Sequence, residues 1–262
     1  MTPPKLQYHH FRVTELKKFM QIFIAKIAFN QTTVEDIKIV SRGRTAAPIE
    51  SCYLGSDNAV VLPPDQFLWK KRVPDAVVGV WRDGSLITVA EKVTDSRSPK
   101  PGCIVITLES PHRSEYSLMG FIPRMPLSDP QSKSHLYQFL PDLIRDIGGL
   151  PDGTEVVLCN PVPYQASLDR IMKAGTGVQK AVRNAVWRAL FRGGFRRDFV
   201  GRLCQYKPSV VINACTRDLR RDVTLALQGI CDIESFRNTL IFNCSHHPCV
   251  WLRKPTLSPL EA

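Results

Sequence analysis

Three polar side chains with different chemistry each follow an apolar run of this sequence. Glu109 comes just after CIVITL, Asn160 directly after EVVLC, and His247 shortly after TLIFN. A carboxylate can stabilise positive charge or activate water, and an imidazole can donate a hydrogen bond to a departing group. A carboxamide has one acceptor oxygen and two donor hydrogens, so it can read the edge of a planar polar ring. Any one of these residues alone is most often part of a turn, but three convergent polar groups are rarely accidental, and they indicate a candidate site.

The elements that must position these residues form an alternating pattern. Apolar strands are expected at residues 103–108, 155–159, 209–213 and 239–243, and helices at 136–147, 178–191, 197–206 and around 223–227. This alternation predicts an α/β fold, a three-layer α/β/α arrangement with a central parallel sheet. Sites in such sheets lie beyond the carboxyl ends of the strands, where all three polar residues fall.

The first hundred residues have a different pattern. Residues 14–29 predict a helix, because apolar side chains recur there at helical spacing. Strands are expected at 59–62, 76–81 and 86–89, with Asp83-Gly84 as a hairpin turn between the last two. The polar, proline-rich segment 94–102 predicts a boundary. We therefore expect a smaller α+β N-terminal domain at 1–98 and the α/β domain at 99–262.

Composition restricts the class of protein and its partners. The 262 residues include 35 Lys and Arg against 24 Asp and Glu, a formal charge of +11, which indicates an acidic partner. With 44% hydrophobic and 23% charged residues, the chain is neither disordered nor fibrous. The apolar stretch 19–29 is shorter than the roughly 20 residues of a membrane span, and residues 1–11 do not resemble a secretion signal. We expect a cytoplasmic protein without a membrane partner, and a monomer.

Cysteines and basic residues add two further expectations. Cys103, Cys159, Cys215 and Cys244 lie in or beside apolar runs, so they are expected to be buried, reduced thiols. The stretch from residue 170 to 197 contains no Asp or Glu but many basic residues, among them Lys173, Lys180, Arg188 and Arg192. Such a stretch suits a track for phosphates, although a charge run is more often only a solvated helix face.

Four short motifs together resemble the uracil-DNA glycosylase superfamily. They are Leu108-Glu109-Ser110-Pro111-His112, Asn160 after VVLC, the segment Lys207-Pro208-Ser209-Val210-Val211-Ile212, and His247-Pro248. Their order and spacing agree over residues 103–253. The resemblance implies an enzyme that flips a base out of double-stranded DNA and hydrolyses its N-glycosidic bond, leaving an abasic site. It implies no cofactor, because the chain has no Cys-x-x-Cys pair to begin an iron–sulfur site, and no metal is expected.

The resemblance also assigns roles to individual residues. Glu109 would stabilise the cationic sugar or activate water, and His247 would hydrogen-bond the base carbonyl. Asn160 would read the base, with His112 beside it and with Phe121, or else Tyr116, stacking on the ring. Trp251 and Leu252 lie where relatives carry a wedge that holds the helix open, and Arg253 follows as a phosphate contact.

The substrate is expected to differ from uracil. The tyrosine that excludes 5-substituted pyrimidines has no equivalent, since His112 and Arg113 follow the proline. The chain is similar in this respect to an anti-phage branch whose members remove glucosylated 5-hydroxymethylcytosine from phage DNA. Two alternatives stay open: repair of uracil or deaminated bases, and a non-catalytic DNA-binding module on the same scaffold.

Overall fold

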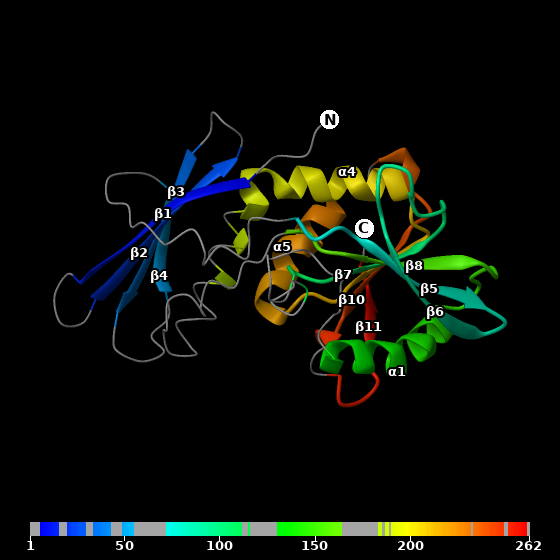
Figure 1. Ribbon diagram of the computed structural model, residues 1–262. Coiled ribbons are helices and arrows are strands. Elements are labelled where there is room, and N and C mark those ends of the chain that lie inside the picture. The colour runs from blue at the N-terminus through cyan, green and yellow to red at the C-terminus, as the bar shows by residue number, and fades with distance from the viewer. Residues whose placement is uncertain are drawn as a thin grey trace. The chain divides into compact units, whose positions relative to one another are not determined.

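The computed structural model describes the backbone of residues 6–15, 20–29, 34–42 and 49–54 and most of residues 72–260. The exceptions within 72–260 are residues 112–114, 116–129, 164–182, 185–186, 189, 232 and 249–250, and residues 130–134, 193 and 235 are described by backbone alone. The chain divides into two compact units. The first comprises residues 1–71 and 164–195, and the second residues 72–163 and 196–262. Figure 1 labels the elements of both.

The first unit contains a four-stranded antiparallel sheet. Its strands β1 (Leu6–Glu15), β2 (Met20–Phe29), β3 (Val34–Arg42) and β4 (Ile49–Leu54) pair in sequence order. The helix expected at 14–29 is therefore wrong. The segment is rich in Ile and Phe, which favour strands. A short apolar run is compatible with a helix or a strand, and here pairing with the neighbouring strands decides for the strand. The strand expected at 59–62 lies outside the described residues.

The second unit is built on a seven-stranded sheet of order β11-β10-β9-β7-β8-β5-β6. Its strands are β5 (Ala76–Arg82), β6 (Ser85–Lys92), β7 (Ile104–Thr107), β8 (Thr154–Cys159), β9 (Val210–Asn213), β10 (Leu240–Cys244) and β11 (Leu257–Pro259). The four middle strands, β10, β9, β7 and β8, are mutually parallel. This confirms the expected parallel core. The remaining strands are antiparallel and form both edges, of which β11 was not expected.

Helices cover both faces of this sheet, which confirms the α/β class. Helix α1 (Pro130–Ile147) lies on one side and α4 (Arg196–Tyr206) and α5 (Arg217–Gln228) on the other (Figure 1). Strand side chains alternate between the faces. Ile104, Ile106 and Leu158 pack with Leu140 of α1 in one buried cluster, and the alternate positions of the strands are equally buried. Burial on both faces explains why these strands are continuously apolar.

The domain boundary expected at residues 98/99 falls inside the second unit. Strand β5 pairs with β8, with Ala76 opposite Leu158, and so the hairpin β5–β6 belongs to the main sheet. The turn expected at Asp83-Gly84 is confirmed, since both residues have positive φ, at 50° and 69°. The expectation failed because a proline-rich segment is typical of a long loop as well as of a linker, and its composition does not distinguish the two.

The expected helices of the second unit and the expected buried cysteines are confirmed. Helices α1, α4 and α5 include the segments expected at 136–147, 197–206 and 223–227, and residues 183–184, 187–188 and 190 of the segment 178–191 are helical. The four cysteines expected to be buried are buried, free thiols, and burial raises the pKa of Cys103 to about 12. None of the helices in the described part of the chain has the length and apolar character needed to cross a membrane.

Candidate active site at the carboxyl ends of the parallel strands

The strand order places a topological switch point between β7 and β9. From β7 the chain proceeds to β8 on one side, while the later strands β9 and β10 lie on the other side. Loops leaving β7 and β9 therefore run in opposite directions across the sheet, and open α/β sheets bind ligands at such a switch point. Glu109 follows β7, and Thr216 follows β9, so both lie at this position.

Glu109 is buried, with 7% of its surface exposed, and has a fixed orientation. Its Oε2 accepts a hydrogen bond of 2.8 Å from the backbone N–H of Thr216. Thr216 is the N-cap residue of α5, so the carboxylate lies at the positive end of that helix, a position that stabilises negative charge. The Glu109 carbonyl also accepts a hydrogen bond of 3.3 Å from Val162 N–H. The loops after β7, β8 and β9 are thereby connected through one residue.

Asn160, directly after β8, carries an unsatisfied acceptor. It is 4% exposed, and its Oδ1 is buried without a hydrogen-bond partner among the residues that the structure describes. Leaving a buried acceptor unpaired costs about 1–3 kcal/mol. In native proteins nearly all buried polar atoms have a hydrogen-bond partner, so this oxygen is suited to accept a hydrogen bond from a ligand.

His247 is half-buried in the loop after β10, and its neighbours are tightly held. Arg220 Nη2 donates to the carbonyls of Ser245 (2.9 Å) and Cys215 (3.3 Å), connecting the loops after β10 and β9. Nδ1 of His135, in α1, lies 3.1 Å from the carbonyl oxygen of Pro248. The imidazole therefore lies on a loop fixed from both faces of the sheet.

The wedge position needs a correction. Trp251 is 1% exposed, belongs to the core cluster under α1, and donates its indole N–H to His246 O at 2.8 Å. It cannot enter DNA, because a buried ring that satisfies its own N–H anchors the loop instead. Leu252 is 84% exposed, and Arg253 is exposed beside it. Of the two residues predicted as a wedge, only Leu252 is free to act as one.

The remaining expected site residues divide by whether the structure describes them. His112, Tyr116, Phe121, Lys173 and Lys180 lie outside the described residues. Arg188 is half-buried, and Arg192 is exposed in the short π-helical turn η4 (Phe191–Phe195). In the same segment, the rings of Trp187 and Phe191 stack with centroids 4.6 Å apart.

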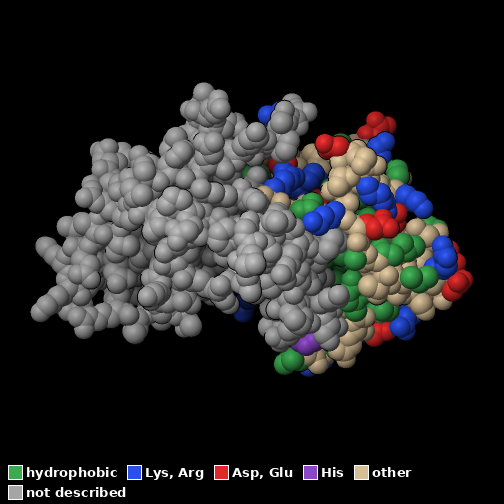
Figure 2. Space-filling model, in the orientation of Figure 1, with side chains coloured by type: hydrophobic (Ala, Val, Ile, Leu, Met, Phe, Trp, Pro, Cys, Tyr) green, Lys and Arg blue, Asp and Glu red, His purple; other side chains and the backbone are tan. Residues whose placement is uncertain are grey.

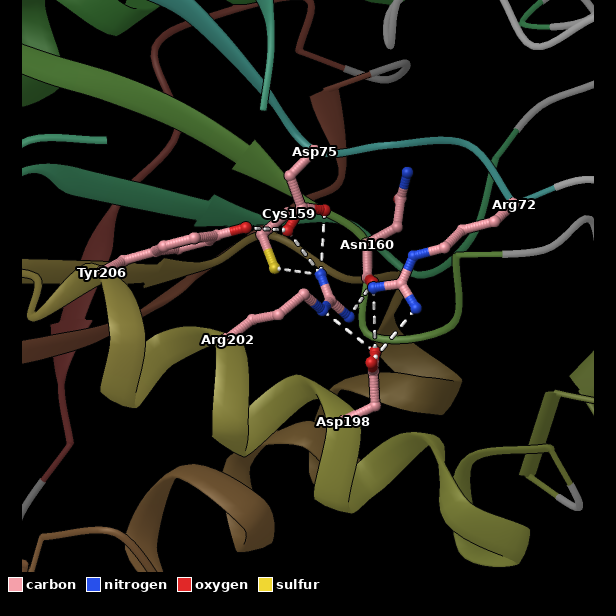
Figure 3. Close-up of polar contacts among 7 residues, drawn as sticks. All are labelled: Arg72, Asp75, Cys159, Asn160, Asp198, Arg202 and Tyr206. Atoms are coloured by element: carbon pink, nitrogen blue, oxygen red, sulfur yellow. Dashed lines mark hydrogen bonds and ion pairs between the residues drawn. The ribbon is translucent and has the colours of Figure 1, made fainter. Parts of the chain in front are cut away.

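A buried ionic network beneath Asn160 was not predicted (Figure 3). Arg202 of α4 contacts the carboxylates of Asp75 (2.6 Å) and Asp198 (3.0 Å), the Sγ of Cys159 (2.8 Å) and the carbonyl of Asn160 (2.9 Å). Burial opposes the charge on Arg202, but the neighbouring anions, Asp75 above all, raise its pKa well above the usual range. Arg202 is therefore a cation held under the strand end that carries Asn160.

The sequence did contain a signal for this network. In α4 the buried residues are Phe199, Arg202, Leu203 and Tyr206, which share the helix face that packs on the sheet. An arginine on a buried apolar stripe must find partners for its charge. That position therefore predicts a structural ion pair, although it does not name Asp75 as the partner.

The fold and these loops define the class of the protein: an α/β protein with a polar site at the carboxyl ends of its parallel strands. Comparisons of the chain with protein-family models, with curated proteins and with solved structures found no match. In the described ranges, no three His, Cys, Asp or Glu side chains lie together in a way that could hold a metal ion.

Proposed function

We propose that the protein is a DNA glycosylase of the uracil-DNA glycosylase type, which flips a pyrimidine out of duplex DNA and hydrolyses its N-glycosidic bond. The observation that carries the proposal is the placement of Glu109, Asn160 and His247 after the first, second and fourth strands of one parallel core. These are the strand ends that the motif resemblance requires. The helices on both faces of the sheet are consistent with the same family.

The chemistry of the three groups fits this reaction. Cleavage of the bond develops positive charge on the sugar and negative charge on the departing base. Glu109, a buried carboxylate at a fixed position, stabilises the sugar cation and orients the attacking water. His247 hydrogen-bonds the base carbonyl, and Asn160 offers its unpaired acceptor to an N–H of the base edge.

Access to a paired base also requires a residue that holds the DNA helix open. The base must leave the stack at a cost of a few kcal/mol. Leu252, exposed on a loop anchored by Trp251, fills the space that the flipped base leaves, and Arg253 contacts a phosphate. The wedge loop thus follows the same strand, β10, as His247.

The favoured substrate is glucosylated 5-hydroxymethylcytosine in phage DNA, which would make the protein a cytoplasmic anti-phage enzyme. The support is the sequence Pro111-His112-Arg113, which lacks the tyrosine that excludes bulky 5-substituents in uracil-specific relatives. Cytosine also suits Asn160, since its exocyclic amino group supplies an N–H to the unpaired oxygen.

The test is mass spectrometry of the bases released from three DNAs: uracil-containing, unmodified, and glucosylated phage DNA. We expect release from the glucosylated DNA with the formation of alkali-labile sites. Glu109→Gln should lower the single-turnover rate by at least about 100-fold, because the carboxylate's charge and basicity are lost. Asp152→Asn is the matched control, since Asp152 is an exposed carboxylate at the amino end of β8.

The outcomes separate the alternatives. If the protein released only uracil, its role would be base repair and the proposed role in phage defence would be wrong. Salt-sensitive DNA binding without release of any base would overturn the catalytic proposal in favour of a binding module. An unchanged rate in Glu109→Gln would remove Glu109 from the mechanism, even if the wild-type protein is active.

A further inference from the structure

The segment that leads into β5 is attached to the loop carrying Asn160. Val73 N–H donates to the carbonyl of Pro163, three residues after Asn160, at 2.8 Å. Two residues later, Asp75 is 5% exposed and accepts hydrogen bonds from Arg202 and from the hydroxyl of Tyr206 (2.8 Å). This short segment therefore supports the Asn160 loop, directly at one end and through Arg202 at the other.

Arg202 is the centre of this arrangement, and its donors divide into two groups (Figure 3). Nη1 and Nε are directed at the carboxylates of Asp75 and Asp198, which fix the plane of the guanidinium. Nη1 also reaches Cys159 Sγ, and Nη2 reaches the carbonyl of Asn160. The carboxylates thus orient the rigid, forked guanidinium of Arg202. Its other hydrogen bonds hold Cys159, the last residue of β8, and Asn160, the residue that follows.

The two oxygens of Asn160 differ in their hydrogen bonding, which suggests what the Arg202 guanidinium does. Its backbone carbonyl is occupied by Arg202, while its side-chain Oδ1 is buried without a partner in the described part of the chain. A side chain with an unpaired oxygen would relax toward any nearby donor unless its backbone were held. Only a planar group with donors in several directions can satisfy two carboxylates, a thiol and a carbonyl together, which lysine cannot do.

We propose that Arg202, oriented by Asp75 and Asp198, is a positioning residue that holds Asn160 in the geometry in which its amide reads the base. The inference rests on the proposed function for its kinetic consequence, but not for its structural one. Arg202 touches no substrate and acts through Asn160 alone. Asp75, just before β5, and Tyr206, at the end of α4, are both buried and complete the network around Arg202.

Arg202→Lys is the first test variant, because it keeps the charge and removes the fork. We expect the single-turnover rate to fall about 100-fold, the loss typical of a catalytic group displaced by an ångström. The affinity for the DNA should change little. Arg72→Met is the matched control: Arg72 also pairs with Asp198, at 3.1 Å, but its described hydrogen bonds do not include Asn160. Its rate should stay close to that of the wild-type protein.

A second variant guards against misfolding. Replacing a buried ion pair by apolar side chains of similar volume often preserves stability, whereas removing one partner does not. In Asp75→Leu/Arg202→Met/Tyr206→Phe, the charges and the tyrosine hydroxyl that would be left unpaired are removed together, and Asp198 keeps Arg72. This variant should fold and still show the loss of rate. A folded triple variant with the wild-type rate would overturn the proposal.

A double-mutant cycle distinguishes positioning from general stabilisation. If Arg202 acts through Asn160, then Arg202→Lys should lower the rate no further in a chain that already carries Asn160→Ala. Losses that multiply independently would overturn the inference.

Hydrogen exchange separates this inference from the proposed function. The backbone N–H groups of residues 159, 160 and 162 should exchange faster in Arg202→Lys than in Arg72→Met, whether or not the wild-type protein releases a base. Unchanged exchange would refute the positioning role. Absence of base release by the wild-type protein would instead refute the proposed function. The hydrogen-exchange comparison would still test the structural role of Arg202.

Discussion

At the scale of single residues, the site depends on polar side chains that are buried beneath the strand ends. Asn213, the last residue of β9, is fully buried and donates to Asn243 Oδ1 (3.1 Å) and Thr224 Oγ1 (3.1 Å). Its own Oδ1 accepts the backbone N–H of Cys215 at 3.3 Å. Because Asn213 satisfies groups on β10 and α5 together, it fixes where the loops after β9 and β10 begin. These loops carry Thr216 and His247.

Trp251 and Leu252 are adjacent residues for which the structure predicts opposite effects. Trp251→Ala should lower the free energy of unfolding by about 3–5 kcal/mol, since it empties part of the core and removes the hydrogen bond to His246. Leu252→Ala should change it by less than about 0.5 kcal/mol, because the side chain is 84% exposed. Urea unfolding of the two variants measures both values.

Leu252→Ala should nevertheless impair base release from duplex DNA. The wedge is needed only where a base must be extruded, so the rate on single-stranded DNA should change little. Rates measured on matched duplex and single-stranded substrates give the comparison. An equal loss on both substrates would argue against a wedge.

At the scale of elements, the hairpin β5–β6 shows how closely the sheet edge is packed. Gly79 lies in β5 beside a register shift, and a Cβ there would stand 2.5 Å from Leu86 Cδ1 and 3.3 Å from the carbonyl oxygen of Ile87. Leu86 packs against the main core. A larger residue at this position would force the Leu86 side chain to shift out of its packing against the core and would crowd the Ile87 carbonyl.

Gly79→Ala and Gly201→Ala should change stability in opposite directions. Gly79→Ala should destabilise the protein by about 1–3 kcal/mol through overpacking. Gly201 lies exposed in the middle of α4, with no atom within 4 Å of an added Cβ, so Gly201→Ala should stabilise by about 0.5–1 kcal/mol. Thermal unfolding followed by circular dichroism tests both. A stabilising Gly79→Ala would contradict the packing argument.

At the scale of the whole molecule, the Lys and Arg side chains that the structure describes do not form a continuous patch on the face shown in Figure 2. There the described Lys and Arg side chains are interspersed with Asp and Glu. Many basic residues are also already paired, such as Lys254, whose Nζ lies 2.6 Å from Asp146. The formal charge of +11 already subtracts the acidic partners, so it does not by itself show which cations are available to phosphates.

Arg253 and Lys254 provide a test of this distinction. Arg253→Ala should weaken DNA binding and reduce the slope of log K against log salt by about 0.9, the value for one phosphate contact. Lys254→Ala should have a smaller effect, since its ammonium is already partly neutralised by Asp146. Fluorescence anisotropy over a series of salt concentrations measures both slopes. A larger effect of Lys254→Ala would show that the pair with Asp146 opens on binding.

Local sequence patterns were enough to predict the parallel core and the strand ends at which the candidate site lies. Continuous apolar runs that alternate with helical segments are typical of parallel strands buried on both faces. The residues that follow these runs, including Glu109, Asn160 and His247, could therefore be placed at one edge. The thiols of Cys103 and Cys159 followed from the same pattern. Local period and composition carry this information without knowledge of the rest of the fold.

Tertiary structure alone decided which distant segments meet. The residues 20–29 became a strand because neighbouring strands paired with it, and β5 joined the main sheet across a segment whose composition is typical of a linker. Trp251 and Leu252 are adjacent in sequence, yet one is core and the other surface. The contact of Arg202 with Asp75, 127 residues away, likewise depends on long-range packing. Pairing and burial between distant segments are properties of the folded chain, and no local pattern encodes them.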